Sequence, residues 1–546
     1  MSSSLVRAVT VSLVILLPSL RVFAQTQVTP KTVKSLGSVS GKVTIKGKGA
    51  PGVVVALHRS DFFNSYESTA RATTDQDGNY KINNVAAGAY QVSFGAVGYV
   101  PANNISGFRN IAVGDGENIE NVNFTLVRGG VITGKITDAD GRPVIEQAVR
   151  LFSADIPDQQ QGQTQPSQPI NVSFTDDRGI YRMFGLNAGR YKVASGRGDF
   201  VFGYINNLGR VPYKEVFYPD TQDYAKAKVL EVSEGSESTG IDISLGRPVE
   251  SFSASGRVIE GEKGQPVANK QLAMQRLVGD VVEYLPQFLS TNGLGEFTAE
   301  GLTPGKYQVS LMSELNGAMR SENTSFDIID SDVTGITVRV VKGASISGSV
   351  VLETDDKRAF ANLTQLQIQA YVQPSPGLVT GSFSQASIGG DGSFLIGGLP
   401  SGTVNVAISR MKGYLLSRIE RDGVTQARGL EVKEGEQVTG VRVVVNYGTA
   451  TLRGLVRIEN DSLPDGARIF VRLVKPGETL NIRPPNVDER GHFFVDGLSP
   501  GSYEITASII GGNAKPTRSV KQTVVLEDGV TTDVNITLDL AAGPKP

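Results

Sequence analysis

The sequence predicts an all-β protein made of five tandem β-sandwiches in an extended array. A phrase of turn and core residues recurs five times in the 546 residues, starting at residues 75, 176, 292, 389 and 488. Such fixed self-similarity is typical of a repeat architecture. Short segments alternate apolar and polar side chains with the two-residue period of a half-buried strand, and no sustained helical period is present. Each repeat has about 100 residues, the size of an ordinary domain.

The phrase keeps glycines and aromatic residues at fixed distances. From the turn glycine of the first copy, Gly78, Tyr80 follows after two residues, Gly88 after ten and Tyr90 after twelve. The turn glycines of the other copies are Gly179, Gly295, Gly392 and Gly491. Alternation predicts that Tyr80 and Tyr90 point into the core. The fourth copy departs, with Gly389 in place of the first turn aspartate and Val404 in place of the corner tyrosine, so we expect a looser turn and corner there.

The elements follow one order in every repeat. An opening strand with a central glycine, residues 39–43 in the first repeat, is followed by a polar turn and a second apolar strand, residues 53–57. The phrase supplies the next strands, and a final pair across an acidic turn, residues 111–126, closes the repeat. About seven strands per repeat, with regular turn signals, predict a seven-stranded Greek-key sandwich.

These elements give a predicted domain map. We expect a signal peptide over 1–24, a linker over 25–35 and a tail over 541–546. The predicted sandwiches are 36–128, 129–247, 248–343, 344–447 and 448–540, with long loops 154–170 and 197–226 in the second. The links between closing and opening strands have only two or three residues, which predicts a semi-rigid rod.

The N-terminus has the pattern of a secretory signal. Arg7 precedes a short apolar run, and Val22-Phe23-Ala24 is a small-residue cleavage site that leaves Gln25 first. The alternative is a membrane anchor, but the run is short and Pro18 interrupts it. No later segment is apolar enough to span a bilayer, so we expect no transmembrane segment in the mature chain. We expect an exported protein of the periplasm, the cell surface or the extracellular space.

Composition argues against most enzyme classes. The chain has no cysteine and two histidines, His58 and His492, in repeats that a rod would hold far apart. A zinc site or a Ser-His-Asp triad lacks its ligands or its base, so we expect no catalytic residue, no metal and no cofactor. A net charge of −2 disfavours nucleic-acid binding. The spacing of Asp75, Asp77 and Asn79 fits either calcium ligands or an aspartate-stabilised turn, and the turn is preferred because the acids do not recur.

The phrase also carries a family resemblance. The opening strand, the Asp-x-x-Gly-x-Tyr turn, the Leu/Val-x-x-Gly-x-Tyr-x-Val corner and the closing pair resemble carboxypeptidase regulatory-like domains over about residues 36–540. The stretch 217–221 resembles a segment of exported bacterial multi-repeat proteins. The resemblance implies transthyretin-like sandwiches of the carbohydrate-binding-like fold and an accessory, non-catalytic role. It implies no peptidase activity.

The second repeat contains the predicted ligand-binding residues. Aromatic residues are dense between 200 and 224, and the candidates are Phe202, Tyr204, Tyr213, Phe217 and Tyr218. Exposed aromatic rings could stack on sugars or hold a partner peptide. The alternative is that they enlarge the core at one end of the sandwich. The absence of tryptophan counts against specialised sugar binding.

Three functions remain open on this reading. The first is an exported structural rod that displays a binding surface, and the second is a carbohydrate-binding array with a polysaccharide ligand. The third is an accessory subunit of an envelope transport or peptidase complex, with an envelope protein as partner. It rests on analogy alone.

Overall fold

The computed structural model describes residues 35–540 except for internal gaps. The gaps are 61–67, 103–106, 156–168, 197–212, 262–263, 279–280, 286–288, 322, 373–381, 410, 461, 465, 477–483 and 512–518. The predicted signal peptide, nearly all of the linker, the C-terminal tail, and most of loops 154–170 and 197–226 therefore lie outside the described residues.

The described chain folds into successive pairs of sheets, called here the first to fifth sandwich. In each, one sheet holds the opening strand (the opening sheet) and the other is called the second sheet. The opening sheet of the first sandwich has β1 (Gly37–Ile45), β2 (Lys48–Gly49), β5 (Asn79–Val85), β7 (Tyr99–Pro101), β9 (Asn118–Ile119) and β10 (Phe124–Arg128). Its second sheet has the order β4 (Ala70–Thr73), β3 (Val54–Arg59), β6 (Gly88–Gly95) and β8 (Arg109–Val113), so β8 is an edge strand.

The second and third sandwiches repeat this plan. The opening sheet of the second has β11 (Gly130–Thr137), β14 (Ile180–Leu186), β18 (Glu237–Ser238) and β19 (Ile243–Ser244). Its second sheet has β12 (Ala148–Ser153), β13 (Asn171–Phe174), β15 (Gly189–Ser195), β16 (Val216–Phe217) and β17 (Leu230–Val232), followed after β16 by the short helix η1 (Tyr224–Lys226). The opening sheet of the third has β20 (Phe252–Glu260), β21 (Gln265–Pro266), β25 (Glu296–Leu302), β27 (Met319–Ser321) and β29 (Val333–Lys342). Its second sheet has β22 (Gln271–Val278), β23 (Val281–Tyr284), β24 (Leu289–Ser290), β26 (Gly305–Leu311) and β28 (Thr324–Ile328).

The last two sandwiches have longer central strands. The opening sheet of the fourth has β30 (Ala344–Glu353), β33 (Ser393–Leu399), β35 (Tyr414–Arg421), β36 (Val424–Thr425) and β38 (Gln437–Tyr447). Its second sheet has β31 (Gln367–Val372), β32 (Ser382–Ser387), β34 (Gly402–Ile408) and β37 (Leu430–Val432). Two short helices, α1 (Lys357–Ala361) and η2 (Leu363–Gln365), precede β31. The fifth, as described, has three strands in each sheet, β39 (Ala450–Glu459), β41 (His492–Leu498) and β44 (Thr531–Asp539) opposite β40 (Ala467–Val474), β42 (Gly501–Gly511) and β43 (Val520–Leu526). The all-β sandwich class predicted from the sequence is confirmed, while the boundaries assigned to the repeats stay predictions.

Each sandwich closes over its own hydrophobic core. Tyr80 and Tyr90 are buried in the first core together with Val39, Val92 and Leu126, as the alternation predicts. The closing strand pairs in parallel with the opening strand, for example β10 with β1 and β44 with β39. The central glycine of the opening strand permits the approach of the closing segment, because a Cβ at Gly41 would lie 2.1 Å from the carbonyl oxygen of Val122.

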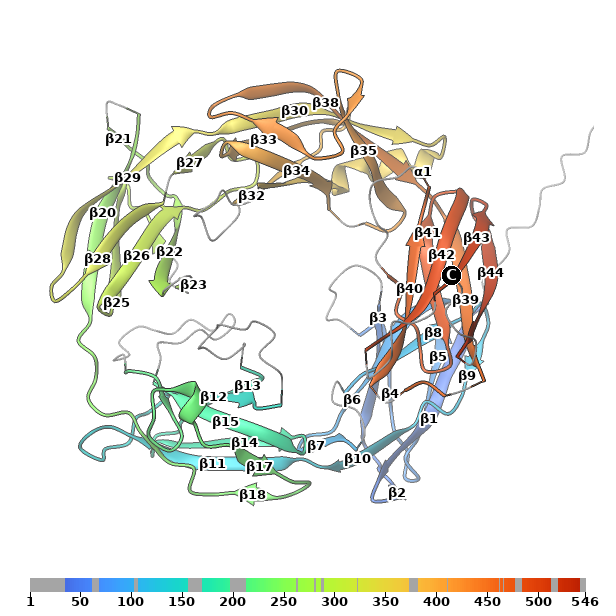
Figure 1. Cartoon of the computed structure of the whole chain (residues 1–546), viewed down its shortest axis with the longest axis horizontal. Helices are drawn as coiled ribbons and strands as arrows, with labels where there is room; N and C mark the ends of the chain where they lie inside the picture. The colour runs from blue at the N-terminus through green and yellow to red at the C-terminus, as the bar shows by residue number, and fades with distance from the viewer. Residues whose placement is uncertain are drawn as a thin grey trace, which may run out of the picture.

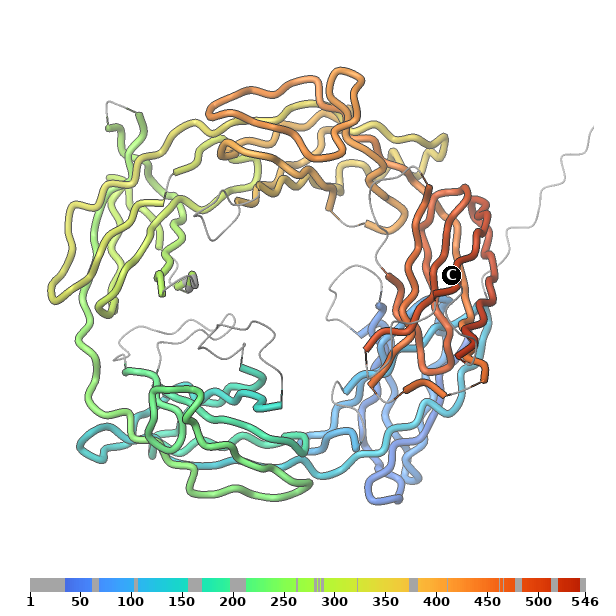
Figure 2. Tube along the Cα trace, in the orientation of Figure 1, coloured from blue at the N-terminus to red at the C-terminus, as the bar shows by residue number. Residues whose placement is uncertain are grey.

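The five sandwiches form a closed ring (Figures 1 and 2). In the second to fourth sandwiches, the second sheets, such as β12 with β15 and β22 with β26, face the inside of the ring. Strand β41 of the fifth sandwich contacts β6 and β8 of the first. The ring differs from the extended rod that the short links predict. Backbone hydrogen bonds join neighbouring sandwiches, such as those from the N–H of Gly235 to the carbonyl oxygen of Arg128 and from the N–H of Asn316 to that of Gln385. The rotation at each step brings the two ends together.

Candidate functional site

The predicted ligand-binding aromatics of the second sandwich do not form one exposed surface. Phe202 and Tyr204 lie outside the described residues. Phe217 is 2% exposed, and Tyr213 and Tyr218 are partly buried against the second core. Phe217 packs on Phe152 and Tyr224, with ring centroids 6.0 and 5.6 Å apart, and these rings form a small satellite core. A ring so enclosed cannot serve as a stacking platform, whereas ligand binding by the other four stays a prediction.

Residues 213–227 cover the solvent side of the second sheet, which explains this burial. The segment places Glu215 2.7 Å from Arg150 of β12, and both side chains are mostly buried. It also places the ring of Tyr224 beneath Lys192 of β15, whose Nζ lies 3.9 Å from the ring centroid and donates to the Tyr224 carbonyl. The aromatic density of this repeat therefore includes a second layer of core.

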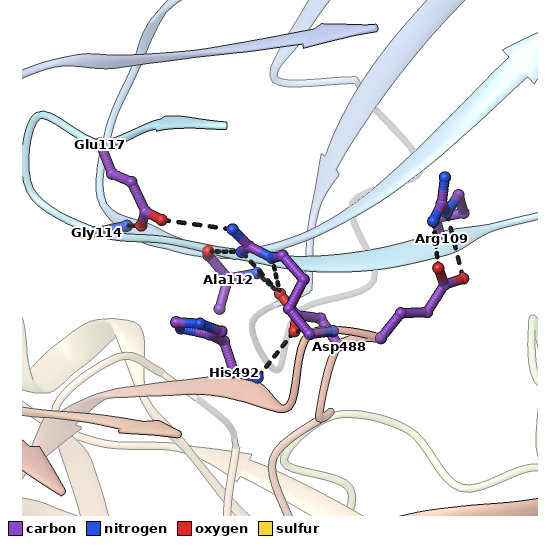
Figure 3. Close-up of polar contacts among 8 residues, drawn as sticks. Arg109, Ala112, Gly114, Glu117, Asp488 and His492 are labelled. Atoms are coloured by element: carbon purple, nitrogen blue, oxygen red, sulfur yellow. Dashed lines mark hydrogen bonds and ion pairs between the residues drawn. The ribbon is translucent and has the colours of Figure 1, made fainter. Parts of the chain in front are cut away.

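A different cluster of polar side chains joins the first sandwich to the fifth and so closes the ring. The turn of the fifth sandwich that begins at Asp488 lies against the edge strand β8 of the first (Figure 3). Asp488 Oδ2 accepts a hydrogen bond of 3.2 Å from the backbone N–H of Ala112. The guanidinium of Arg490 donates to the carbonyl oxygen of the same residue at 2.8 Å. The turn thus satisfies the outward N–H and C=O of an edge strand, which would otherwise be open to pairing.

Charged pairs surround this contact. Arg490 also lies 3.4 Å from Glu117, whose other oxygen accepts from the N–H of Gly114 at 2.6 Å (Figure 3). Arg109 of β8 forms a two-pronged ion pair with Glu489 (Figure 3). These contacts define the ring junction, consisting of Ala112, Glu117 and Arg109 of the first sandwich and residues 488–490 of the fifth.

A second group of contacts extends the ring junction along β41. Asp496 forms ion pairs with Arg59 of the first sandwich at 3.1 Å and with Lys412 of the fourth. Asn486 donates to the hydroxyl of Ser60 at 2.8 Å. The carboxylate of Asp496 therefore contacts both neighbours of the fifth sandwich.

The turn itself is built by local hydrogen bonds. Asp488 Oδ1 accepts from the backbone N–H groups of Arg490 at 2.9 Å and His492 at 2.8 Å, which leaves Oδ2 for Ala112 and for the arginine. The same turn occurs at Asp75, whose Oδ1 accepts from Asp77 and Asn79. The acid is a turn-forming residue in both places, which agrees with the preferred reading of Asp75 as a turn residue.

The ring junction borders a pocket of about 280 Å³. Its lining includes Pro101, Arg109, Asn123, Phe124 and Glu489. Arg109 is the cationic group on the wall, but it already donates to Glu489 and to the carbonyl of Asn123. Its charge is thus paired within the protein, so among the described lining residues the one cation is not available to an anionic ligand.

The two histidines lie in sandwiches that the ring brings together, contrary to the separation expected of a rod. The His58 ring bonds Ser93 of β6 at 2.9 Å, and His492 lies on β41, which contacts β6. Among the described residues, no three His, Cys, Asp or Glu side chains are grouped so that they could hold a metal ion. No helix in the same part of the chain is long and apolar enough to cross a bilayer.

The sequence did not reveal the ring junction in advance. Residues 488–490 were visible only as a copy of the repeated turn, and β8 only as half of a closing pair. The one available signal was that Arg490 is matched by Asp77, Leu294 and Asp391 in the first, third and fourth copies. An arginine that the turn does not require indicates a second use.

Comparison with known families agrees with the fold. The family model of the carboxypeptidase regulatory-like domain matches residues 38–127, which is the first sandwich. This segment is a carboxypeptidase regulatory-like domain. The other sandwiches share its phrase of turn and core residues.

Curated relatives and solved structures match only in part. Serine-aspartate repeat-containing protein C of Staphylococcus aureus (strain N315) is 28% identical over 169 residues, which is 28% of this chain and 17% of that protein. A streptococcal ancillary pilin covers 56% of this chain and 99% of its own, at 12% identity and a TM-score of 0.23. The minor pilin GBS52 of Streptococcus agalactiae covers 39% and 96%, at 14% identity and a TM-score of 0.21.

Proposed function

We propose that this protein is an exported, non-catalytic structural protein that presents a binding surface at the cell envelope or outside the cell. Its sandwiches act as a scaffold whose two ends are held together by the ring junction. The scaffold has the form of a closed ring in place of the rod expected from the links.

One observation supports a structural role above all. The side chains that recur in the phrase are used to build the fold. The corner tyrosines Tyr90, Tyr191, Tyr307 and Tyr503 are buried, and each donates its hydroxyl to the carbonyl oxygen four residues earlier. The turn acids accept backbone N–H groups in the same way in three copies, at Asp75, Asp176 and Asp488. Repetition here preserves a shell and not a reaction centre.

Export is tested by expressing the full chain in a bacterial host. Cell fractionation and N-terminal mass spectrometry should find the protein outside the cytoplasm, beginning at Gln25. The matched control is Ala24→Asp, which should leave the leader uncleaved because signal peptidase requires a small residue at that position. Wild-type protein that stays in the cytoplasm with its leader intact would contradict the proposal.

Glycan binding is a second candidate, favoured by an exposed aromatic pair in the fourth sandwich. Tyr371 of β31 and Phe383 of β32 are directly paired across the strands and are 45% and 48% exposed. Asn405 of β34 pairs with Tyr371 on the other side, and Gln369 and Gln385 form the next row. Aromatic faces beside uncharged amides are suited to stacking on, and hydrogen bonding to, a neutral sugar ring.

Affinity electrophoresis through gels containing soluble neutral polysaccharides tests this surface. Tyr371→Ala with Phe383→Ala should remove any retardation, while Phe360→Ala, an exposed aromatic of the same sandwich, should not. Absence of retardation of the wild type on every glycan would exclude the candidate and leave the structural role intact.

A further inference from the structure

The second sandwich has a turn with the same sequence pattern as the ring-junction turn. Residues 176–178 are Asp-Asp-Arg, residues 488–490 are Asp-Glu-Arg, and a turn glycine follows in both. Asp176 Oδ1 accepts from the N–H groups of Arg178 and Ile180 at 3.0 and 2.8 Å. Asp488 Oδ1 accepts in the same way from the N–H groups two and four residues later.

The arginine side chains are also held alike. Arg178 donates through Nε and Nη2 to Asp176 Oδ2 at 3.2 and 2.8 Å. Arg490 donates through the same two atoms to Asp488 Oδ2 at 3.1 and 2.8 Å. The second sandwich therefore presents its arginine in the same pre-formed geometry as the arginine that contacts Ala112 in the ring junction, and no described residue outside the turn pairs with it. Little side-chain freedom would be lost on docking.

The two turns differ in what covers them. At the ring junction the side chains of Asp488 and Arg490 are 2% and 38% exposed, whereas those of Asp176 and Arg178 are 37% and 71% exposed. Within the described residues, Arg178 has no hydrogen-bond partner except Asp176. The turn also folds without an arginine, because Leu294 stands at this position in the third sandwich and Asn292 still accepts both N–H groups.

We propose that residues 176–178 form a second docking element, and that its partner is the edge strand β8 of another copy of this chain. The charges are complementary in the same register as at the ring junction. Asp177 would replace Glu489 opposite Arg109, and Arg178 would replace Arg490 opposite Glu117 and the carbonyl of Ala112. The acid is shorter by one methylene, and the other groups are the same.

Docking in trans competes with ring closure. A closed copy has its β8 edge covered by its own fifth sandwich, so the turn at 176–178 finds no open partner. When the ring junction is released, the edge of β8 becomes available. Residues 176–178 of one copy then dock on β8 of the next. The inference depends on the ring junction, and not on export.

The test is sedimentation velocity over a concentration series with the full mature chain. Wild type should be monomeric. Glu489→Ala with Arg490→Ala leaves β8 intact but removes two of the charged side chains that cover it in cis and in trans, and should self-associate. Adding Asp177→Ala and Arg178→Ala should weaken that association at least about tenfold, since several charge-assisted contacts are lost together. The matched control adds Asp140→Ala and Arg142→Ala instead, which removes an exposed ion pair of the same sandwich and should have no effect.

Small-angle scattering on the same samples reports whether the ring has opened. If the double alanine variant stays closed, the charge reversal Glu489→Lys with Arg490→Glu replaces it. An open variant that remains monomeric at 100 times the concentration at which wild type is assayed would overturn the inference. So would association that the changes at 177 and 178 leave intact. Neither result would affect the proposed structural function.

Discussion

The corner tyrosines of the first, second, third and fifth sandwiches each contribute one hydrogen-bonded hydroxyl as well as a buried aromatic ring. Tyr503 is fully buried and donates to the carbonyl oxygen of Ser499 at 2.8 Å. The hydrogen bond closes the short loop between β41 and β42, so the buried aromatic ring of Tyr503 and the loop hold each other in place. In the fourth sandwich Val404 fills the same core position without a hydroxyl.

Removing one such hydroxyl should therefore be measurable. Tyr503→Phe should lower the free energy of unfolding of the fifth sandwich by about 1 to 2 kcal/mol, because a buried carbonyl loses its donor. Tyr371→Phe, which changes an exposed hydroxyl without a hydrogen-bond partner in the described residues, should change stability by less than about 0.5 kcal/mol. Both stability changes are measured by thermal unfolding and by hydrogen exchange in the fifth sandwich. Equal effects would contradict the assigned role.

The turn acids make a pH-dependent contribution to stability. Donation by the N–H of Asn79 holds the pKa of Asp75 below its usual value of 3.8, and the bonds to Arg178 and to the N–H of Ile180 do the same for Asp176. Because the folded pKa is depressed, this stabilisation is fully present above the unfolded pKa. It is lost as the pH falls through the folded pKa.

Asp75→Asn should remove the contribution of this group to the pH dependence. Asparagine keeps an acceptor oxygen, as Asn292 shows in the third sandwich, so stability at pH 7 should hardly change. Below about pH 4 the variant should lose less stability than wild type. Unfolding of the first sandwich between pH 2 and 7 measures this, and parallel curves for both proteins would contradict it.

At the scale of elements, the links between sandwiches are not equivalent. Three link glycines donate their N–H to the preceding sandwich and so extend one of its ladders: Gly129 to Gly98, Gly343 to Ala318 and Gly448 to Gly413. In the second link, residues 246–251, Gly246 accepts from the N–H of Ala139, whereas residues 247–251 make no backbone hydrogen bond within the described part of the chain. The second link is therefore the least restrained step of the ring.

Hydrogen exchange should reveal this difference. Amides of residues 247–251, apart from Pro248, should exchange faster than those of residues 129–131, because unprotected amides exchange without local opening. Mass spectrometry of overlapping peptides compares the two links within one sample. Equal protection would mean that contacts other than backbone hydrogen bonds restrain the second link.

Elements were easier to predict from sequence than their pairing. The inward positions of Tyr80 and Tyr90 follow from a period of two, and both are buried. The parallel pairing of β10 with β1 was missed, because alternation is the same for either direction and only the close approach at Gly41 distinguishes them. The fourth turn was expected to be loose, yet Asp391, two residues later, accepts the N–H of Ser393 and replaces the missing acid.

At the scale of the whole molecule, ring closure could not be inferred from sequence. Short links predict restricted movement between neighbours but not the direction of each turn, which depends on backbone contacts between sandwiches such as that from Gly235 to Arg128. The ring junction also joins residues more than 370 positions apart, such as Asp488 and Ala112. The aromatic density of the second repeat was correctly seen as unusual, but composition does not tell whether a ring covers a sheet or faces water, and Phe217 does the former.

The ring should open at high ionic strength. Its junction rests largely on ion pairs with exposed partners, such as Arg109 with Glu489, and salt at about 1 M shortens the screening length to about 3 Å. We expect the radius of gyration from small-angle scattering to rise between about 0.05 and 1 M salt. Arg490→Ala should shift the transition to lower salt, whereas Arg142→Ala, from an exposed pair elsewhere, should not. A radius that is the same at all salt concentrations would show that apolar packing closes the ring.

The parallel pairing of first and last strands has a mechanical consequence. In the fifth sandwich β39 and β44 run side by side through nine paired positions, from Thr451 with Thr531 to Glu459 with Asp539. Tension between the start of β39 and the end of β44 pulls these strands past each other lengthwise, so all rungs of the ladder bear the load at once. Under stretch, the salt-sensitive junction would yield first, and the sandwiches would then resist as a chain of shear-loaded units.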